Sequence, residues 1–182
     1  MSEDNISARV AKLEARIQEL EDLRAIQDLV YRYGYSFDDG RMDDFIDCFT
    51  EDCVGEYLPF AEGFNGRDEI TRFAEGARGK FPRLTETFHF TVSPVIVLDG
   101  DVASSRWHWM NPSSAEEASG EFVSAWQFGI YEMEFRREES GWKISRNKVT
   151  YLHVFDLTKG YAGQPMFILG SGDAAAADHA TA

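Results

Sequence analysis

Apolar residues recur at every third or fourth position of the segment 23–37. This spacing predicts an amphipathic helix with one buried face. Gly40 follows as a left-handed C-cap, and residues 41–49 open a second, short helix. Asp38 then falls in the last turn of the first helix, close to its apolar face. Because the helix dipole does not favour an acid at that end, Asp38 is either simply solvated or held there for a purpose.

A second pattern precedes this helix. Its apolar residues are spaced 4-3-4-3 and are Ile6, Val10, Leu13, Ile17 and Leu20. They make about two heptads of a coiled-coil seam, too few for a free coiled coil. We therefore expect residues 1–22 to form a helical arm that packs against the domain or a neighbouring subunit. An arm that stands alone is the alternative.

The rest of the chain changes from helical to strand periodicity. Residues 53–58 predict a strand, 59–66 a loop, and 67–80 a third helix stopped by Pro82. Further strands are predicted over 85–98, with a break at Pro94, and over 102–110, 121–138 and 142–155, with a polar connection over 111–120. Three helices followed by hairpins of long strands predict an α+β domain, with the helices packed on one face of a strongly bent, mixed or antiparallel sheet. Because the strands are apolar on both faces, the other face must line a cavity or meet another subunit.

Length, composition and net charge limit the number of domains and the kinds of binding partner that we expect. The 182 residues predict one domain over 23–157 and a partly disordered tail over 158–182. A net charge of −14 makes nucleic acid and anionic membranes poor partners. The sequence has no long apolar run, no signal-peptide core and only two cysteines, so we expect a cytoplasmic protein.

Three histidines fall on successive predicted strands. They are His89, His108 and His153. Each one alone is more often a core or surface residue than a catalytic one. Their spacing permits a three-histidine metal site but does not require it, and we predict none.

Several short motifs resemble one family. They are Ile26-Gln27-Asp28-Leu29, Tyr33 with Phe37-Asp38-Asp39-Gly40-Arg41, Phe49-Thr50-Glu51-Asp52, Gly66-Arg67-Asp68-Glu69-Ile70, Thr87-Phe88-His89-Phe90 and Gly141-Trp142-Lys143-Ile144. Over residues 20–157 the chain resembles the nuclear transport factor 2-like superfamily of SnoaL-like proteins. Within it, the chain looks most like the branch of scytalone dehydratase, bile-acid 7α-dehydratase and hexachlorocyclohexane dehydrochlorinase. The resemblance implies a cone-shaped, cystatin-like fold that encloses a cavity.

The resemblance also implies a catalytic dyad, with Asp38 holding the imidazole of His89. Tyr33 stands where the dehydratases have a tyrosine, and His108 matches a second histidine of scytalone dehydratase. Asn111 stands where bile-acid dehydratase has a second aspartate. Leu152 replaces the arginine of the dehydrochlorinase, so halide departure would lose its helper.

The expected activity is that of a cofactor-independent lyase. His89, as a neutral imidazole, would remove a proton from carbon, while Tyr33 or His108 would assist the leaving group of a hydrophobic cyclic or aromatic substrate. Expected substrate contacts are Tyr35, Tyr57, Phe60, Trp107, Asn111, Trp126 and His153. The alternatives are carbon–carbon cleavage that releases a small aldehyde, isomerisation or cyclisation by the same dyad, and a non-catalytic role as a ligand carrier or oxygenase small subunit. A homo-oligomer is expected, with the resemblance favouring a trimer over a dimer.

Overall fold

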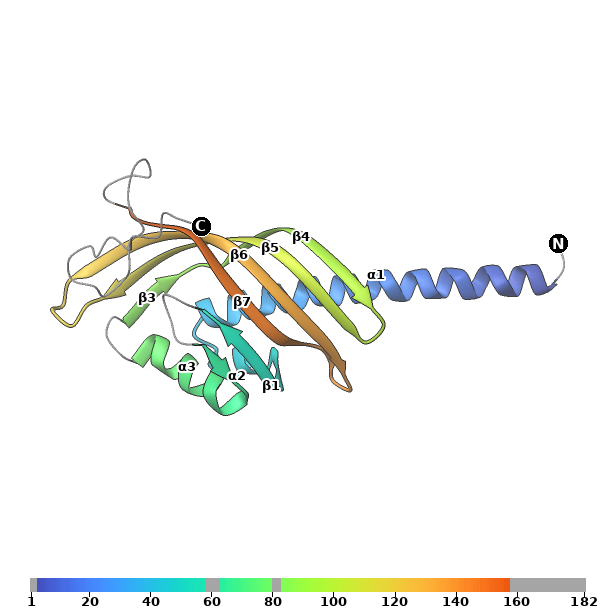
Figure 1. Ribbon diagram of the computed structural model, residues 1–182, viewed down its shortest axis with the longest axis horizontal. Helices are drawn as coiled ribbons and strands as arrows, with labels where there is room; N and C mark the ends of the chain where they lie inside the picture. The colour runs from blue at the N-terminus through green and yellow to red at the C-terminus, as the bar shows by residue number, and fades with distance from the viewer. Residues whose placement is uncertain (1–2, 58–62, 80–82, 158–182) are drawn as a thin grey trace, which may run out of the picture.

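The computed structural model describes residues 3–57, 63–79 and 83–157. Its first element, helix α1 (Glu3–Asp38), is a single helix of 36 residues. The N-terminal half of α1 projects beyond the sheet, and the C-terminal half lies beneath it (Figure 1). The predicted arm and the predicted first core helix are thus one continuous element.

The C-terminal half of α1 is held by the apolar face that its periodicity predicted. Ile26, Leu29, Val30, Tyr33 and Phe37 are each at most 6% exposed. Gly40 has φ +74°, the left-handed conformation expected of a C-cap. Two short helices follow in sequence, α2 (Met42–Ile46) and α3 (Arg67–Gly79).

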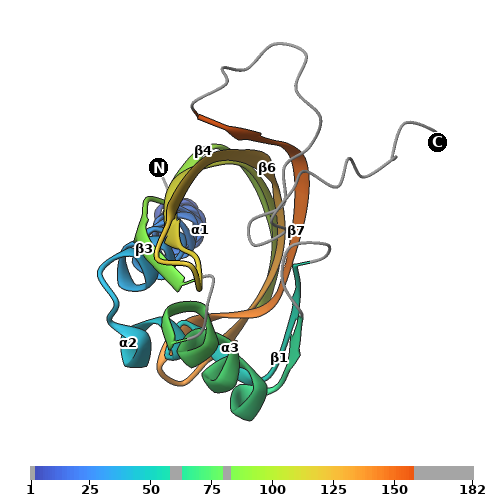
Figure 2. The same cartoon turned by 90° about the vertical axis from the view of Figure 1, so that its left-hand side faces the viewer.

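In the part of the chain that the structure describes, the sheet has seven strands. They are β1 (Phe49–Glu56), β2 (Phe64–Asn65), β3 (Arg83–Thr87), β4 (Phe90–Asp99), β5 (Val102–Glu116), β6 (Phe122–Glu138) and β7 (Gly141–Asp156). The order is β2-β1-β7-β6-β5-β3, with β4 pairing a second stretch of β5. Only the β1–β7 pair is parallel among these pairings. Seen end-on, the strands curl into a half-barrel whose open side is closed by the helices (Figure 2). The α+β prediction with a strongly bent mixed sheet is confirmed.

Two strand predictions were wrong in detail. The expected strand 85–98 is broken at residues 88 and 89, not at Pro94. The β4 register shifts between Val92 and Val95, and this irregularity accommodates the proline on a strand that pairs only with β5. Residues 111–116, expected as a connection, continue β5 and pair with β6. Their polar side chains indicated a loop, whereas Asn111 and Ser113 are buried.

Strand alternation gives each face of the sheet its own residues. Along β5, Ser105, Trp107, Trp109 and Asn111 point to the concave, helix-covered face and are buried. The alternate residues point to the convex face. In the part of the chain that is described, no helix is both long and apolar enough to cross a bilayer.

Candidate active site

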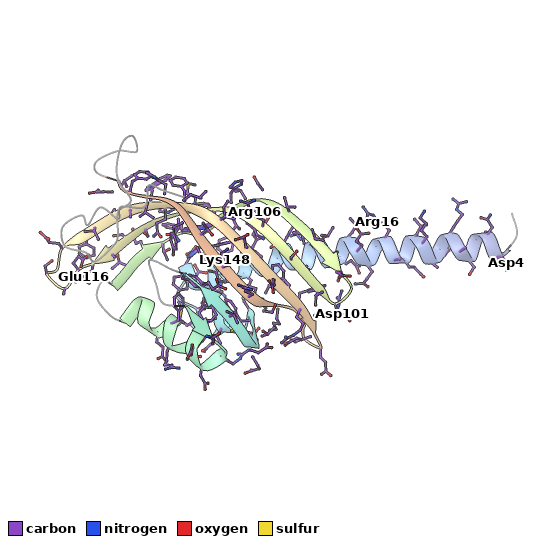
Figure 3. All side chains as sticks on the ribbon, in the orientation of Figure 1. Asp4, Arg16, Asp101, Arg106, Glu116 and Lys148 are labelled. Atoms are coloured by element: carbon purple, nitrogen blue, oxygen red, sulfur yellow. The ribbon has the colours of Figure 1, made fainter. Side chains whose placement is uncertain are left out.

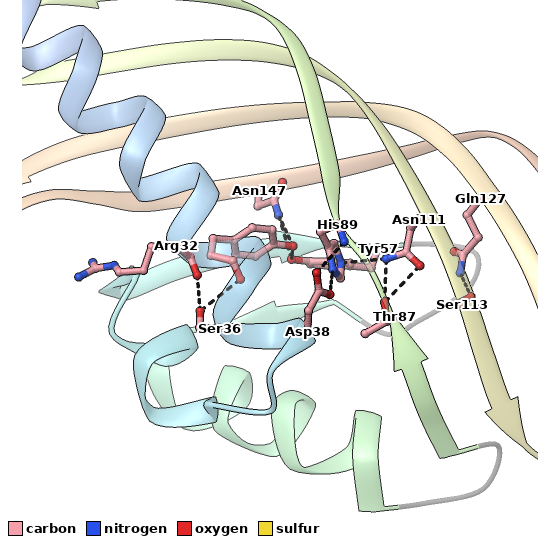
Figure 4. A network of polar contacts seen from close by, with 11 residues as sticks. Arg32, Ser36, Asp38, Tyr57, Thr87, His89, Asn111, Ser113, Gln127 and Asn147 are labelled. Carbon is pink, nitrogen blue, oxygen red and sulfur yellow. Dashed lines mark hydrogen bonds and ion pairs between the residues drawn. The ribbon is translucent and has the colours of Figure 1, made fainter.

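Two side chains from distant parts of the chain meet where α1 ends. Asp38 is the last residue of α1, and His89 lies in the break between β3 and β4. The Asp38 Oδ1 atom is 2.5 Å from His89 Nδ1, and Asp38 Oδ2 accepts the His89 backbone N–H at 2.7 Å (Figure 4). Both side chains are 12% exposed. One carboxylate therefore fixes both the ring and the backbone of the histidine.

The break in the strand and a glycine on the helix make this contact possible. His89 lies outside the ladder, so its backbone N–H is available to Asp38. Gly34 lies one turn before Asp38 on α1, and a Cβ on Gly34 would come within 3.1 Å of the His89 Cβ. The absence of a side chain at this position lets the helix approach the histidine closely.

The far nitrogen of the ring meets an amide. Asn111 Nδ2 lies 3.2 Å from His89 Nε2, and the same amide exchanges hydrogen bonds with the Thr87 hydroxyl at 2.9 and 3.2 Å. Because an NH₂ group only donates, Nε2 is the acceptor in this orientation, and the ring proton lies on Nδ1 toward Asp38. The geometry therefore describes a neutral imidazole whose Nε2 lone pair accepts from Asn111.

A second group of polar atoms lies beside the dyad. The Tyr33 ring is edge-on to the His89 ring with centroids 6.1 Å apart, and its hydroxyl is 3.2 Å from the Tyr57 hydroxyl. Asn147 Nδ2 on β7 donates to the hydroxyls of Tyr57 and Tyr33 at 2.9 and 3.3 Å. Burial raises the pKa of both tyrosines well above the usual value of a phenol, so they remain protonated donors.

Two buried polar atoms near these tyrosines have no hydrogen-bond partner within the described chain. They are Asn147 Oδ1 and Trp109 Nε1. The Trp109 ring stacks on Tyr131 with centroids 5.2 Å apart, and Gly129 makes room for it, since a Cβ there would lie 2.5 Å from Trp109 Nε1. Buried donors and acceptors are normally satisfied, so unpartnered ones mark places that a ligand can fill.

The structure thus brings together five of the predicted residues: Tyr33, Asp38, Tyr57, His89 and Asn111. Sequence reasoning missed Gly34, Thr87 and Asn147. The signal for Asn147 was a polar residue among the buried positions of β7, between Ile144 and Val149.

Three of the remaining predicted residues lie on the convex face. His108 is exposed and pairs with Ile130, alternating with inward Trp107 and Trp109. Trp126 pairs with Phe155, and His153 pairs with Phe128, on that same outer face. The structure therefore does not bring these three residues, expected as substrate contacts and in the case of His108 as catalytic, to the Asp38–His89 pair. The histidines also cannot share a metal ion, because His89 is on the opposite side of the sheet.

The last three predicted contacts have other surroundings. Tyr35 is 67% exposed on α1, so it belongs to the surface. Trp107 is fully buried, donates to Ser105 at 2.7 Å and packs edge-on against Tyr31, so it is a core residue. Phe60 lies outside the described residues.

Known proteins resemble this chain over most of its length. The SnoaL-like domain model matches residues 18–148. The uncharacterized protein Rv2910c of Mycobacterium tuberculosis is 30% identical over 137 residues, which cover 74% of this chain and 88% of that protein.

Solved structures show the same fold. An NTF2-like protein with a cystatin-like fold from Novosphingobium aromaticivorans is 28% identical, with a TM-score of 0.63 over 78% of this chain and 89% of that one. A hexachlorocyclohexane dehydrochlorinase, LinA type 2, is 16% identical, with a TM-score of 0.69 over 82% of this chain and 98% of that one. The cystatin-like fold expected from the resemblance is confirmed.

Proposed function

The chain belongs to the SnoaL-like domain family, and on that premise we propose that it is a lyase that acts without a cofactor. It removes a proton from carbon and expels a β-leaving group, water in the simplest case, from a hydrophobic cyclic or aromatic small molecule. The observation that carries the proposal is the Asp38–His89–Asn111 arrangement, in which both ring nitrogens of one histidine are engaged. A likeness in fold to a dehydrochlorinase supports the reaction class.

In the first step, His89 acts as the base. The Nε2 lone pair gives up its hydrogen bond from Asn111 and accepts the proton from a carbon of the substrate. Asp38 holds the other ring nitrogen and stabilises the imidazolium that forms. The electron pair of the broken C–H bond is held in an enolate of the substrate, and it becomes the new C=C bond only when the leaving group departs.

In the second step, the bond to the leaving group breaks. The oxygen departs with its bonding pair and, on receiving the proton, leaves as water. Tyr33, Tyr57 and Asn147 are placed to hydrogen-bond this oxygen, since their hydroxyls and amide already form one cluster beside the His89 ring. Loss of water involves no change of oxidation state overall, so the reaction needs no oxidant or reductant.

The surroundings favour an apolar substrate. The aromatic rings of Phe37 and Tyr33 lie edge-on to His89 at 5.4 and 6.1 Å, and Trp109 and Tyr131 extend the apolar surface. Trp109 Nε1 offers one further donor for a polar group of the ligand. A ring system with few polar atoms matches such walls.

Solvent deuterium exchange tests the proposal without knowledge of the substrate. A panel of cyclic and aromatic β-hydroxyketones is incubated with the protein in D₂O, and both deuterium at the α-carbon and loss of water are followed by mass spectrometry. We expect wild-type protein to catalyse both with at least one compound. His89→Gln and Asp38→Asn should each reduce the rate by about 10²–10⁴-fold.

His108→Gln is the matched control, because it removes an exposed histidine from the opposite face of the sheet. It should leave the rate unchanged. Equal rates for His89→Gln and His108→Gln would contradict the role of His89. Exchange with a shifted double bond and no loss of water would indicate an isomerase instead. Tight ligand binding that is equal in all variants, with no exchange, would favour a carrier.

A further inference from the structure

The N-terminal half of α1 leaves an apolar stripe uncovered. We call residues 3–21 of this helix the arm. Its five seam residues, Ile6, Val10, Leu13, Ile17 and Leu20, are 46–61% exposed. Figure 3 shows the arm projecting past the sheet, with Asp4 at its tip and Arg16 nearer the sheet. A row of large aliphatic side chains in water is a costly arrangement for a single chain.

The stripe follows a heptad register. Val10 and Ile17 occupy a positions, and Leu13 and Leu20 occupy d positions, with Ile6 as the first d. β-Branched residues at a with leucine at d favour two parallel strands over three or four. The residues at the a and d positions therefore indicate that two helices pair along this seam.

The charged residues beside the seam indicate whether the two helices run parallel or antiparallel. Arg9 and Arg16 are at g, and Glu14 and Glu21 are at e. In a parallel pair, each g residue faces the next e residue of the other helix, so Arg9 meets Glu14 and Arg16 meets Glu21 of the second copy. An antiparallel pair would place like charges opposite each other. Charge complementarity thus points to a parallel arrangement with an identical chain.

The arm is already helical as part of α1, which favours its pairing with a second helix. About two heptads cannot sustain an isolated coiled coil, because starting a helix is unfavourable. Here the helix is already started, since the same element continues into the core through Ile26, Leu29 and Val30. At 3.6 residues per turn the seam points roughly 170° away from that buried face, so a second arm need not displace the domain.

We propose that the arm pairs with the arm of a second copy of this chain as a parallel, two-stranded coiled coil, which makes the protein a dimer. The inference does not depend on the catalytic proposal. It also departs from the trimer that the family resemblance favoured, because the a and d residues of the arm favour two helices.

Charge reversal tests the partner and the direction together. One variant carries Arg9→Glu and Arg16→Glu, and the other carries Glu14→Arg and Glu21→Arg. In sedimentation equilibrium at low salt, each variant alone should have a dimer dissociation constant about tenfold or more above wild type, because like charges then face each other. An equimolar mixture should restore the dimer as a heterodimer. If each variant alone dimerises as tightly as wild type, the antiparallel arrangement is correct and the proposal is overturned, because an antiparallel pair has like charges opposite each other both before and after the reversal.

A seam variant tests whether the arm holds the dimer at all. Leu13→Lys should dissociate it, while Ala15→Lys, an exposed f position on the other side of the helix, should not. Both variants should keep the wild-type circular dichroism spectrum of the domain, since neither residue lies in the core. A monomeric wild type, a trimer, or a dimer that survives Leu13→Lys each overturns the proposal.

Discussion

The protonation state of His89 depends on an amide. Asn111 can present an N–H to Nε2, whereas an aspartate in its place could only accept. With carboxylates facing both ring nitrogens, the histidine would hold a second proton to higher pH. The identity of residue 111 therefore affects how readily the ring takes up a second proton.

Asn111→Asp tests this directly. We expect the pH at which the His89 ring resonance titrates, followed by NMR, to rise by about one unit or more relative to wild type. The acidic limb of any catalysed exchange should move upward by the same amount. Asn111→Ala is the control, because it removes the donor without adding a charge and should produce no such rise. A titration in Asn111→Asp that matches wild type would show that the amide does not face the ring in solution.

Side-chain direction limited what could be predicted at single residues. The pairing of Asp38 with His89 came from the family resemblance and the motifs, and the geometry agrees. The inward or outward direction of His108 and His153 could not be derived in the same way. Both faces of these strands carry aromatic residues, and a bulge in β7 near Leu152 changes the parity of the residues that follow.

At the scale of elements, α1 is anchored where its arm reaches the sheet. Asp22 is 8% exposed, accepts from Arg137 at 2.6 Å and from the Trp142 indole at 3.1 Å, and so ties α1 to β6 and β7. The Arg137 guanidinium also lies 4.4 Å above the Trp142 ring. The hydrogen bond from Arg137 lowers the pKa of Asp22. This cluster fixes the direction in which the arm leaves the domain.

Asp22→Asn should destabilise the fold by about 1–3 kcal/mol at pH 7, measured by urea unfolding, because it leaves Arg137 without its buried partner. A carboxyl whose pKa is lowered on folding stabilises the protein above its unfolded pKa, and this contribution is lost as pH falls through the folded pKa. The difference from wild type should therefore shrink below pH ~4. Asp28→Asn, which disrupts an exposed pair with Arg24 on the same helix, should cost under about 0.5 kcal/mol. Equal losses in the two variants would contradict the anchoring role.

The elements themselves were largely predictable, and the exceptions coincide with the site. Helical periodicity identified α1 and α3, and period two identified β6 and β7. The break at residues 88 and 89 and the polar inward half of β5 were missed. At both places the chain departs from a regular pattern to place His89 and Asn111 on the concave face.

At the scale of the whole molecule, several buried tyrosines lie together on the concave side of the sheet. Four of the seven tyrosines of the chain, Tyr33, Tyr57, Tyr131 and Tyr151, lie there between the sheet and the helices. Burial raises the pKa of all four above the usual value of a phenol. The amphipathic pattern predicted a core at this position, but hydrophobicity alone does not show that its polar atoms converge.

These phenols make the stability of the fold sensitive to alkali. A group whose pKa is raised on folding contributes stability that is complete below its unfolded pKa, near 10 for tyrosine, and that declines as pH rises toward its folded pKa. The free energy of unfolding should therefore fall above pH ~10, by about 1.4 kcal/mol per pH unit for each buried tyrosine. Urea unfolding between pH 8 and 11 measures the slope, and absorbance at 295 nm should show these four phenols ionising only as the protein unfolds. Tyr131→Phe should reduce the slope of this decline by the contribution of one buried tyrosine. Tyr35→Phe, on the exposed side of α1, should leave the slope unchanged. If both variants gave the wild-type slope, the alkaline loss of stability would have to come from groups outside this cluster.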